Sequence, residues 1–227
     1  MPTSSTTERS PALDEVARLR ADRLDEAAAV LAAALVDDPG YCHLFPDEAR
    51  REGELRTLYR MTLTDALRHG RVYATTCETD AGAEVTGVVA VYPPGRYPLT
   101  LARWGRLLPR LAAVAVRTRT HGRGLARFGD LTSAGVPTDA WYVEALGVRP
   151  DRQHAGLGRL LMSRVLAVVD ADGERGYLET TRPANLTYYR ALGYEPAGEP
   201  VPLGPDGPWI HRLARPRGAR AEGVAAR

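Results

Sequence analysis

The chain contains no lysine: all 30 of its basic residues are arginine, and isoleucine occurs only once, at Ile210. The lack of lysine and the scarcity of isoleucine are more typical of codon usage than of a function. Because 28 acidic residues balance the arginines, the formal net charge is only +2. A charge this small does not indicate binding to nucleic acid or to a membrane surface, so we expect neither as a partner.

Cysteine is also scarce, since Cys42 and Cys77 are the only two. Their spacing fits neither a metal site nor a disulfide framework, which predicts two reduced thiols and no bound metal. No stretch approaches the roughly 18 apolar residues of a membrane span. The first residues, MPTSSTTERSP, lack the apolar core of a signal peptide. These absences predict a soluble, cytoplasmic protein.

The composition is otherwise that of one compact domain, with 44% hydrophobic residues in a chain of 227. Residues 1–12 and 215–227 are polar or lack a hydrophobic pattern, so we expect disordered termini around a single domain over 13–214. Nothing in the sequence chooses between a monomer and a homodimer.

The most informative stretch reads WYVEALGVRPDRQHAGLGRLLMSR and covers residues 141–164. Trp141 to Val148 is rich in aromatic and branched residues and stops before Arg149-Pro150, which predicts a strand. Apolar residues recur at helical spacing from Leu157 onward, so a helix should begin within the glycine pair Gly156 and Gly158.

A helix start of this kind can bind an anion. The first backbone N–H groups of a helix lack partners within it, and glycine lets a ligand approach them closely. A charge-assisted hydrogen bond contributes about 1.5–3 kcal/mol, against about 0.3–1 kcal/mol from an exposed helix dipole. Converging amides would therefore dominate, although the same string also fits an ordinary helix start with two glycines.

Two motifs together resemble one family. The run VRPDRQHAGLG (148–158) resembles the acyl-CoA pyrophosphate loop of the GNAT acetyltransferases, and YLETTRPANLTYYRALGY (177–194) resembles their second signature. The pair His154-Ala155 departs from the small or basic residues usual in that loop. The resemblance implies an α/β (α+β) fold with a mixed, mostly antiparallel sheet of six to seven strands, flanked by helices and carrying a helical insert before the cofactor strand.

Hydrophobic periodicity predicts the remaining elements. Asp22 is the expected cap of a helix that stops near Asp38-Pro39-Gly40, where a bend should follow. The other expected elements are strands at 16–20, 72–77, 85–92 and 177–181, helices at 47–69, about 155–170 and from 183, and a closing hairpin of 194–196 with 208–213.

Residues 98–128 hold seven arginines and no acidic residue. Trp104, Leu107, Leu108 and Leu111 share one helical face, opposite Arg103, Arg106 and Arg110, which predicts an amphipathic helical insert. Three interpretations stay open: a solvated basic face, a surface for an acidic partner or the cofactor's phosphates, and a helix on a membrane surface.

The resemblance implies acetyl-CoA as co-substrate and assigns its contacts. The backbone of Leu146, Gly147 and Val148 would pair with the pantetheine arm beside a bulge in the cofactor strand, and Asn185 would reach the same arm. The pyrophosphate amides would come from Gln153, His154, Ala155, Gly156, Leu157, Gly158 and Arg159.

Two residues are candidates for acid and base. By resemblance, Tyr189 lies near the thioester sulfur and would protonate the leaving thiolate, or would only pack there. Glu144 is the candidate base, since the two-residue period of a strand places it on the same face as Tyr142, Leu146 and Val148.

The acceptor pocket is less well defined. Tyr41, Phe45 and Tyr142 are candidates to line it, with plain core packing as the alternative for Tyr41 and Phe45. Glu179 could anchor a cationic acceptor or belong to a buried hydrogen-bond network. Three functions remain: acetyl transfer to the primary amine of a small molecule such as an antibiotic or nucleoside-like compound, acetyl transfer to a protein or peptide, and non-catalytic acyl-CoA sensing.

Overall fold

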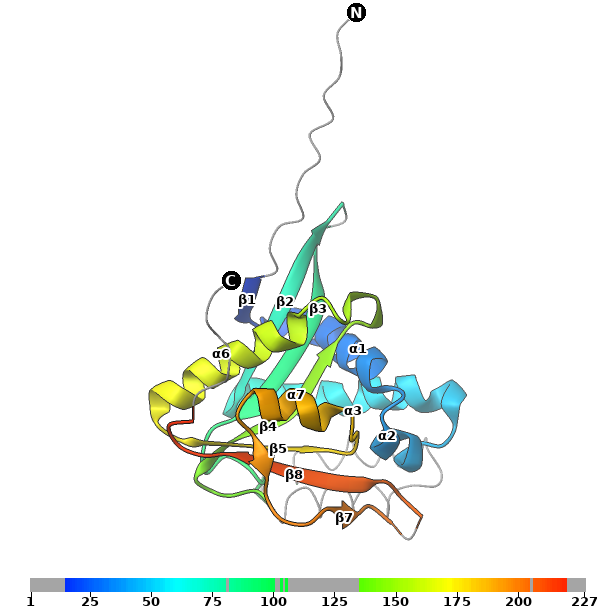
Figure 1. The fold of residues 1–227 in the computed structure, drawn as a ribbon. Helices are drawn as coiled ribbons and strands as arrows, with labels where there is room; N and C mark the ends of the chain where they lie inside the picture. The colour runs from blue at the N-terminus through cyan, green and yellow to red at the C-terminus, as the bar shows by residue number, and fades with distance from the viewer. Residues whose placement is uncertain are drawn as a thin grey trace, which may run out of the picture.

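The computed structural model describes residues 15–80, 82–100, 103, 105, 135–204 and 206–219. Its centre is a sheet of eight strands in the order β1-β2-β3-β4-β5-β8-β6, with β7 beside β8 (Figure 1). The strands are β1 (Glu15–Arg18), β2 (Arg71–Thr79), β3 (Gly82–Tyr92), β4 (Ala140–Val148), β5 (Arg175–Thr180), β6 (Glu195–Pro196), β7 (Val201–Pro202) and β8 (Trp209–Arg215).

Only β4 and β5 pair in parallel, and every other described pair is antiparallel. The mixed, mostly antiparallel sheet expected from the sequence is therefore confirmed. The count of strands exceeds the six to seven expected because β6 and β7 are separate two-residue strands that both pair with β8.

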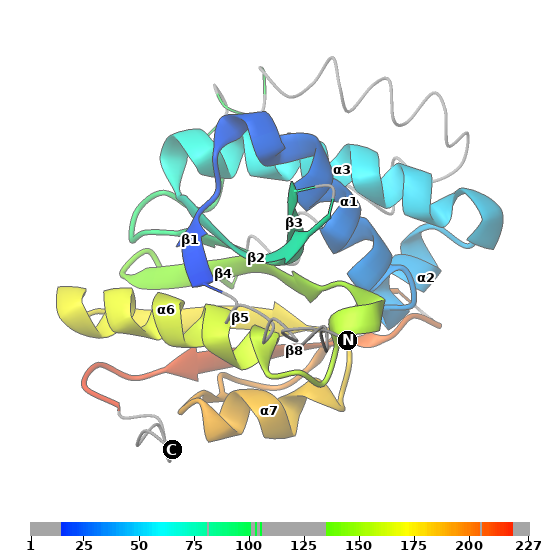
Figure 2. The same cartoon turned by 90° about the horizontal axis from the view of Figure 1, so that it is seen from above.

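Helices cover both faces of the sheet. Figure 2 shows α1 (Leu24–Leu35) and α3 (Glu48–His69) on one side, with α6 (Leu157–Asp172) and α7 (Asn185–Ala191) on the other. Each face has its own hydrophobic core, one centred on α1 and α3 and one on α6 and α7. None of the described helices is long and apolar enough to cross a bilayer.

Helix α1 lies unusually close to β4, and Gly147 allows it to do so. A Cβ atom at Gly147 would stand 2.9 Å from both Ala34 Cβ and Leu31 Cδ2, nearer than real side chains approach. The small alanines of α1 and this glycine thus set the separation between the helix and the strand that carries the site.

The start of α1 differs from the sequence-based expectation. Asp22 does not cap it, because the Asp22 carboxylate accepts from Arg20 Nε at 3.2 Å and lies within a short 3-10 turn, η1 (Ala21–Arg23). Arg23 occupies the N-cap position and makes no capping hydrogen bond; its side chain instead donates to the Glu26 carboxylate in the first turn at 2.5 Å. The 3-10 turn satisfies backbone groups that a capping side chain would otherwise serve.

The expected bend after Asp38 is itself a short helix, α2 (Pro39–Leu44). Asp38 caps it, since its Oδ1 accepts from the Gly40 backbone N–H at 2.9 Å, and Pro39 occupies the first helical position. Both residue types favour a helix start at these positions, so the signal that was interpreted as a stop also begins the next element.

The arginine-rich insert at 98–128 falls almost entirely outside the described residues. Arg103 is one exception, and it is not on a solvated face: it is buried, and its guanidinium pairs with the buried Asp65 carboxylate. Tyr92 donates to the same carboxylate at 2.8 Å. A buried carboxylate needs such partners. Arg103 is therefore buried beside Asp65, although the amphipathic pattern placed it on the polar face of the helix.

The domain extends beyond residue 214. Arg215 is the last residue of β8 and is fully buried. Its guanidinium pairs with Asp170 on α6 (Nη2 to Oδ2, 3.2 Å) and donates to the Leu192 carbonyl oxygen at 3.2 Å. The lack of a hydrophobic pattern after residue 214 hid this contact, because it depends on an ion pair between distant elements.

Candidate active site

The two parallel strands of the sheet separate part-way along their length. β4 pairs with β5 only from Ala140↔Arg175 to Val143↔Leu178. Beyond that point β4 continues along β3, but its register shifts: Val91 faces Val143 and Ala90 faces Ala145, so that Glu144 is an extra residue. A one-residue bulge bends a strand, and here it lies where the sheet opens.

The bulge reverses the side-chain alternation that the sequence suggested. Tyr142 and Ala145 belong to the core under α1 and α3, whereas Leu146 and Val148 pack against the core under α6 and α7. Glu144 shares its face with Tyr142, as expected, but not with Leu146 and Val148. The expectation failed there because a bulged residue breaks the two-residue period.

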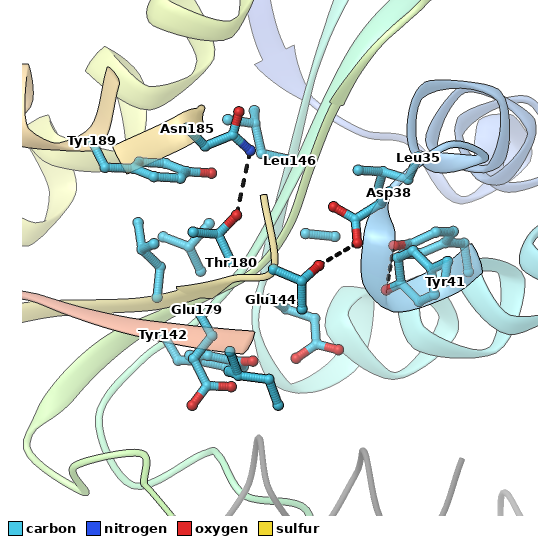
Figure 3. Close-up of a pocket in the computed structure, with 16 residues that line it drawn as sticks. Leu35, Asp38, Tyr41, Tyr142, Glu144, Leu146, Glu179, Thr180, Asn185 and Tyr189 are labelled. Carbon is cyan, nitrogen blue, oxygen red and sulfur yellow. Dashed lines mark hydrogen bonds between the residues drawn. The ribbon is translucent and has the colours of Figure 1, made fainter. Parts of the chain in front are cut away.

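A cavity of about 120 Å³ lies at this opening (Figure 3). Seven predicted site residues line it: Tyr41, Tyr142, Glu144, Leu146, Glu179, Asn185 and Tyr189. Phe45 is not among them and is buried in the core under α1 and α3. Other described lining residues that the sequence did not suggest include Asp38, Tyr59, Thr180 and Thr181.

Glu144 is placed to exchange a proton. Burial raises the pKa of its carboxyl to about 7, and the nearby Asp65 carboxylate adds to the rise while Arg103 opposes it. The residue is partly exposed, but its Oε2 is inaccessible to solvent and has no hydrogen-bond partner among the described residues. A carboxyl group of this pKa holds and releases a proton near neutral pH.

Tyr189 reaches the cavity from the other face of the sheet. Figure 3 shows its ring extending from α7 toward Leu146, beside Asn185. The side chain is buried, and burial raises the pKa of the Tyr189 phenol, so the hydroxyl keeps its proton. Asn185 is held by a hydrogen bond from its Nδ2 to Thr180 Oγ1 at 3.4 Å.

The edge of β4 that faces the opening presents backbone groups. Arg149 donates its N–H to Thr86 O on β3 at 2.8 Å. Because peptide groups alternate in direction along a strand, Gly147 also faces β3, while Leu146 and Val148 face the opening. The Gln153 side chain donates to the Val148 carbonyl oxygen at 3.2 Å, in agreement with this direction.

The glycine loop has the geometry of an anion site. Helix α6 begins at Leu157, and His154 and Gly156 both have positive φ, 64° and 83°. This backbone form turns successive N–H groups toward one point. A Cβ atom added at Gly156 would have no heavy atom within 4 Å, and one at Gly158 would have only Tyr188 Oη (3.6 Å) and Val148 Cγ2 (3.9 Å). The loop is therefore open to a ligand.

The sequence profile of the acetyltransferase (GNAT) family matches residues 41–194, more than half of the chain. The chain belongs to this family. Acetyl-CoA is thus the co-substrate of this GNAT acetyltransferase, and the opening beside β4 and the uncovered loop before α6 fit its pantetheine arm and its pyrophosphate.

Solved structures agree with the fold of this GNAT acetyltransferase. A structure described as histone acetyltransferase HPA2 and related acetyltransferase from Corynebacterium glutamicum has a TM-score of 0.67 at 20% identity, over 91% of this chain and 97% of that one. The PaiA N-acetyltransferase from Thermoplasma acidophilum, solved with coenzyme A, has a TM-score of 0.51 at 10% identity, over 89% and 98%. The ribosomal-protein-S18-alanine N-acetyltransferase from Escherichia coli has a TM-score of 0.50 at 15% identity, over 94% and 100%.

Tyr188, the neighbour of Tyr189, is a residue of this acetyltransferase that is absent from the predicted site residues. Its hydroxyl is buried without a partner among the described residues and lies next to Gly158 at the start of α6. A buried hydroxyl seldom lacks a partner, so this one fits a polar atom of the co-substrate. The tandem Tyr188-Tyr189 was the only signal for it in the sequence.

No group of histidine, cysteine, aspartate or glutamate in the described ranges could hold a metal ion. The described part of the cavity wall presents carboxyl and phenol groups.

Proposed function

We propose that this acetyltransferase transfers an acetyl group directly from acetyl-CoA to a primary amine of a small molecule, with Glu144 as general base and Tyr189 as general acid. One observation carries the proposal: a carboxyl with a pKa of about 7, whose Oε2 has no hydrogen-bond partner in the described part of the chain, and a protonated phenol reach one cavity from opposite faces of the sheet.

The residues divide the work of the transfer. Bound acetyl-CoA supplies an activated acetyl group. Glu144 takes a proton from the amine, so that the nitrogen lone pair can attack the acetyl carbon as the bond from that carbon to sulfur breaks. The Val148 N–H polarises the carbonyl oxygen, and Tyr189 gives a proton to the departing sulfur. Holding amine and acetyl group in contact supplies much of the rate.

The cavity can admit the amine-bearing end of an acceptor. Its volume is about 120 Å³, and carboxyl and phenol groups line it. Residues 141–214 also resemble puromycin N-acetyltransferase, which makes an antibiotic or nucleoside-like amine a candidate. Glu144 stands where that enzyme has a small residue, so puromycin is one acceptor to test among others.

Cys42 and Cys77 are both unpaired. Two free thiols fit the reducing cytoplasm, and we propose that compartment for the reaction.

The test is to incubate the protein with acetyl-CoA and a panel of amines that includes puromycin, short aliphatic amines and peptides, and to follow the release of free thiol. We expect turnover of small primary amines and a loss of about 100-fold or more in kcat for Glu144→Gln. Turnover of peptides alone would replace this proposal with a protein acetyltransferase. Tight acetyl-CoA binding without turnover, unchanged by Tyr189→Phe, would indicate a sensor.

A further inference from the structure

We infer that the acceptor is a short diamine whose second, non-reacting nitrogen binds Glu179. This inference deepens the proposed function and rests on it. It comes from the place of two carboxylates on neighbouring strands, from an unsatisfied oxygen on one of them, and from the charge of the cavity wall.

Glu144 and Glu179 occupy equivalent positions where the sheet opens. The last paired residues of β4 and β5 are Val143 and Leu178, and the two glutamates follow directly. Both carboxylates lie on the face of Tyr142 and Tyr177, whose rings neighbour each other at 6.2 Å. In Figure 3 they lie on the same side of the cavity, away from Tyr189 and Asn185.

Only one of the two carboxyl oxygens of Glu179 accepts hydrogen bonds from the described residues. Its side chain is 5% exposed, and its Oε1 accepts from Tyr177 Oη at 3.1 Å and from Arg212 Nε at 3.3 Å. Its Oε2 is buried, has no hydrogen-bond partner among the described residues, and belongs to a side chain that lines the cavity. A buried carboxylate oxygen without a donor is costly, and an ammonium group in the cavity supplies the missing donor.

The wall of the cavity suits a cation. Three carboxylates line it, those of Asp38, Glu144 and Glu179, and no arginine or histidine does so among the described residues. Asp38 is held in place by the Gly40 backbone N–H and the Thr181 hydroxyl. Tyr41, Tyr59 and Tyr142 add aromatic surface, which also attracts ammonium groups.

A diamine can serve both carboxyl groups. A dication that gives one proton to Glu144 frees one nitrogen for attack and remains a monocation. Its remaining ammonium donates to Glu179 Oε2, whereas a monoamine would leave that oxygen without a donor among the described residues. The two glutamates directly follow the last paired residues of β4 and β5, and paired strands lie about 4.7–4.9 Å apart. Because the strands diverge from there, the carboxyl groups are at least that far apart, and a diamine with roughly four methylene groups between its nitrogens can span such a distance.

The experiment compares diaminobutane with aminopentane, in which a methyl group replaces the second ammonium. Thiol release at saturating acetyl-CoA yields kcat and KM for both amines with the wild type, Glu179→Gln and Glu195→Gln, a matched change at an exposed glutamate on β6. We expect the wild type and Glu195→Gln to favour the diamine by about 10-fold or more in kcat/KM. Glu179→Gln should lose most of this preference through a higher KM for the diamine.

Equal kcat/KM for the two amines in the wild type, or a preference that survives Glu179→Gln, would overturn the inference. If Glu179→Gln fails to fold because Arg212 loses its partner, Asp38→Asn is the second variant. It keeps an oxygen to cap α2 while removing a charge from the cavity, and it should lower the preference by severalfold; an unchanged preference counts against the inference.

Calorimetry separates this inference from the proposed function. Diaminobutane is titrated into the protein with coenzyme A bound, where no transfer occurs. Binding that weakens in Glu179→Gln supports the diamine site even if no amine is acetylated, a result that would remove the proposed function. Turnover of monoamines without detectable diamine binding would overturn the inference and leave the proposed function standing.

Discussion

At the scale of residues, the site depends on one inserted amino acid. Glu144 keeps the face of Tyr142, while the bulge moves Leu146 and Val148 to the opposite face, and the Glu144 Oε2 atom is inaccessible to solvent. In the sequence, Glu144 was a candidate because it lies in the predicted cofactor strand, residues 141–148. The two-residue period, however, suggested a face shared with Leu146 and Val148. Only pairing with β3 reveals the extra residue.

The role of Glu144 predicts a pH dependence. Since burial raises its pKa to about 7, the carboxylate is protonated and inactive as a base below that value. The kcat should therefore rise with pH through about 7 and level off above it. Glu144→Gln should remove this rise along with most of the activity, and Tyr189→Phe should lower kcat by about 10-fold or more while keeping the rise. Initial rates of thiol release between about pH 5.5 and 9 measure both; a rise that persists in Glu144→Gln would assign the base elsewhere.

At the scale of elements, the strand, loop and helix from β4 to α6 act as one unit. The loop preceding α6 was predictable because glycine in a left-handed turn, a helix start and an approach path for an anion are all local properties. The place of Arg103 was not, since it depends on Asp65, which lies elsewhere in the sequence. The α2 helix was missed because its local start signal, Asp38-Pro39, was interpreted only as a stop.

Gly156 offers a test of the loop with an internal control. Aspartate and asparagine tolerate positive φ to a similar degree and differ mainly in charge. Gly156→Asp should weaken acetyl-CoA binding by about 10-fold or more relative to Gly156→Asn, because a carboxylate would stand beside the phosphates. Isothermal titration with acetyl-CoA gives both dissociation constants. Equal affinities for the two variants would mean that the pyrophosphate does not lie at this turn.

At the scale of the whole molecule, the site carries a cost in stability. Burial raises the pKa of Glu144 to about 7 and that of Glu179 to about 8, so the folded protein binds these protons more tightly than the unfolded chain does. Stability must then fall as the pH rises from the ordinary carboxyl range through these values. Buried carboxyl groups that serve a reaction weaken the fold at the pH where they work.

Glu144→Gln should therefore stabilise the protein at alkaline pH while it abolishes activity. At about pH 8 we expect the free energy of unfolding to rise by roughly 1–3 kcal/mol, and near pH 5 we expect little change or a small loss. Urea unfolding at both pH values measures the difference. A variant that is no more stable at pH 8 than the wild type would show that the Glu144 carboxylate is well solvated in the folded protein.

The sequence alone determined the family, the strand that leads into a glycine turn, the helix start at that turn, and the spacing of Asn185 and Tyr189 along α7. Each of these features depends on residues that are close together in the sequence, so hydrophobic periodicity and backbone preferences are enough to predict it. The tertiary structure alone decided the face of Glu144, the pairing of Asp65 with Arg103, and the meeting of Asp38, Glu144 and Glu179 at one cavity. Those contacts join residues far apart in the chain, and only the closing of the sheet and the packing of its helices bring them together.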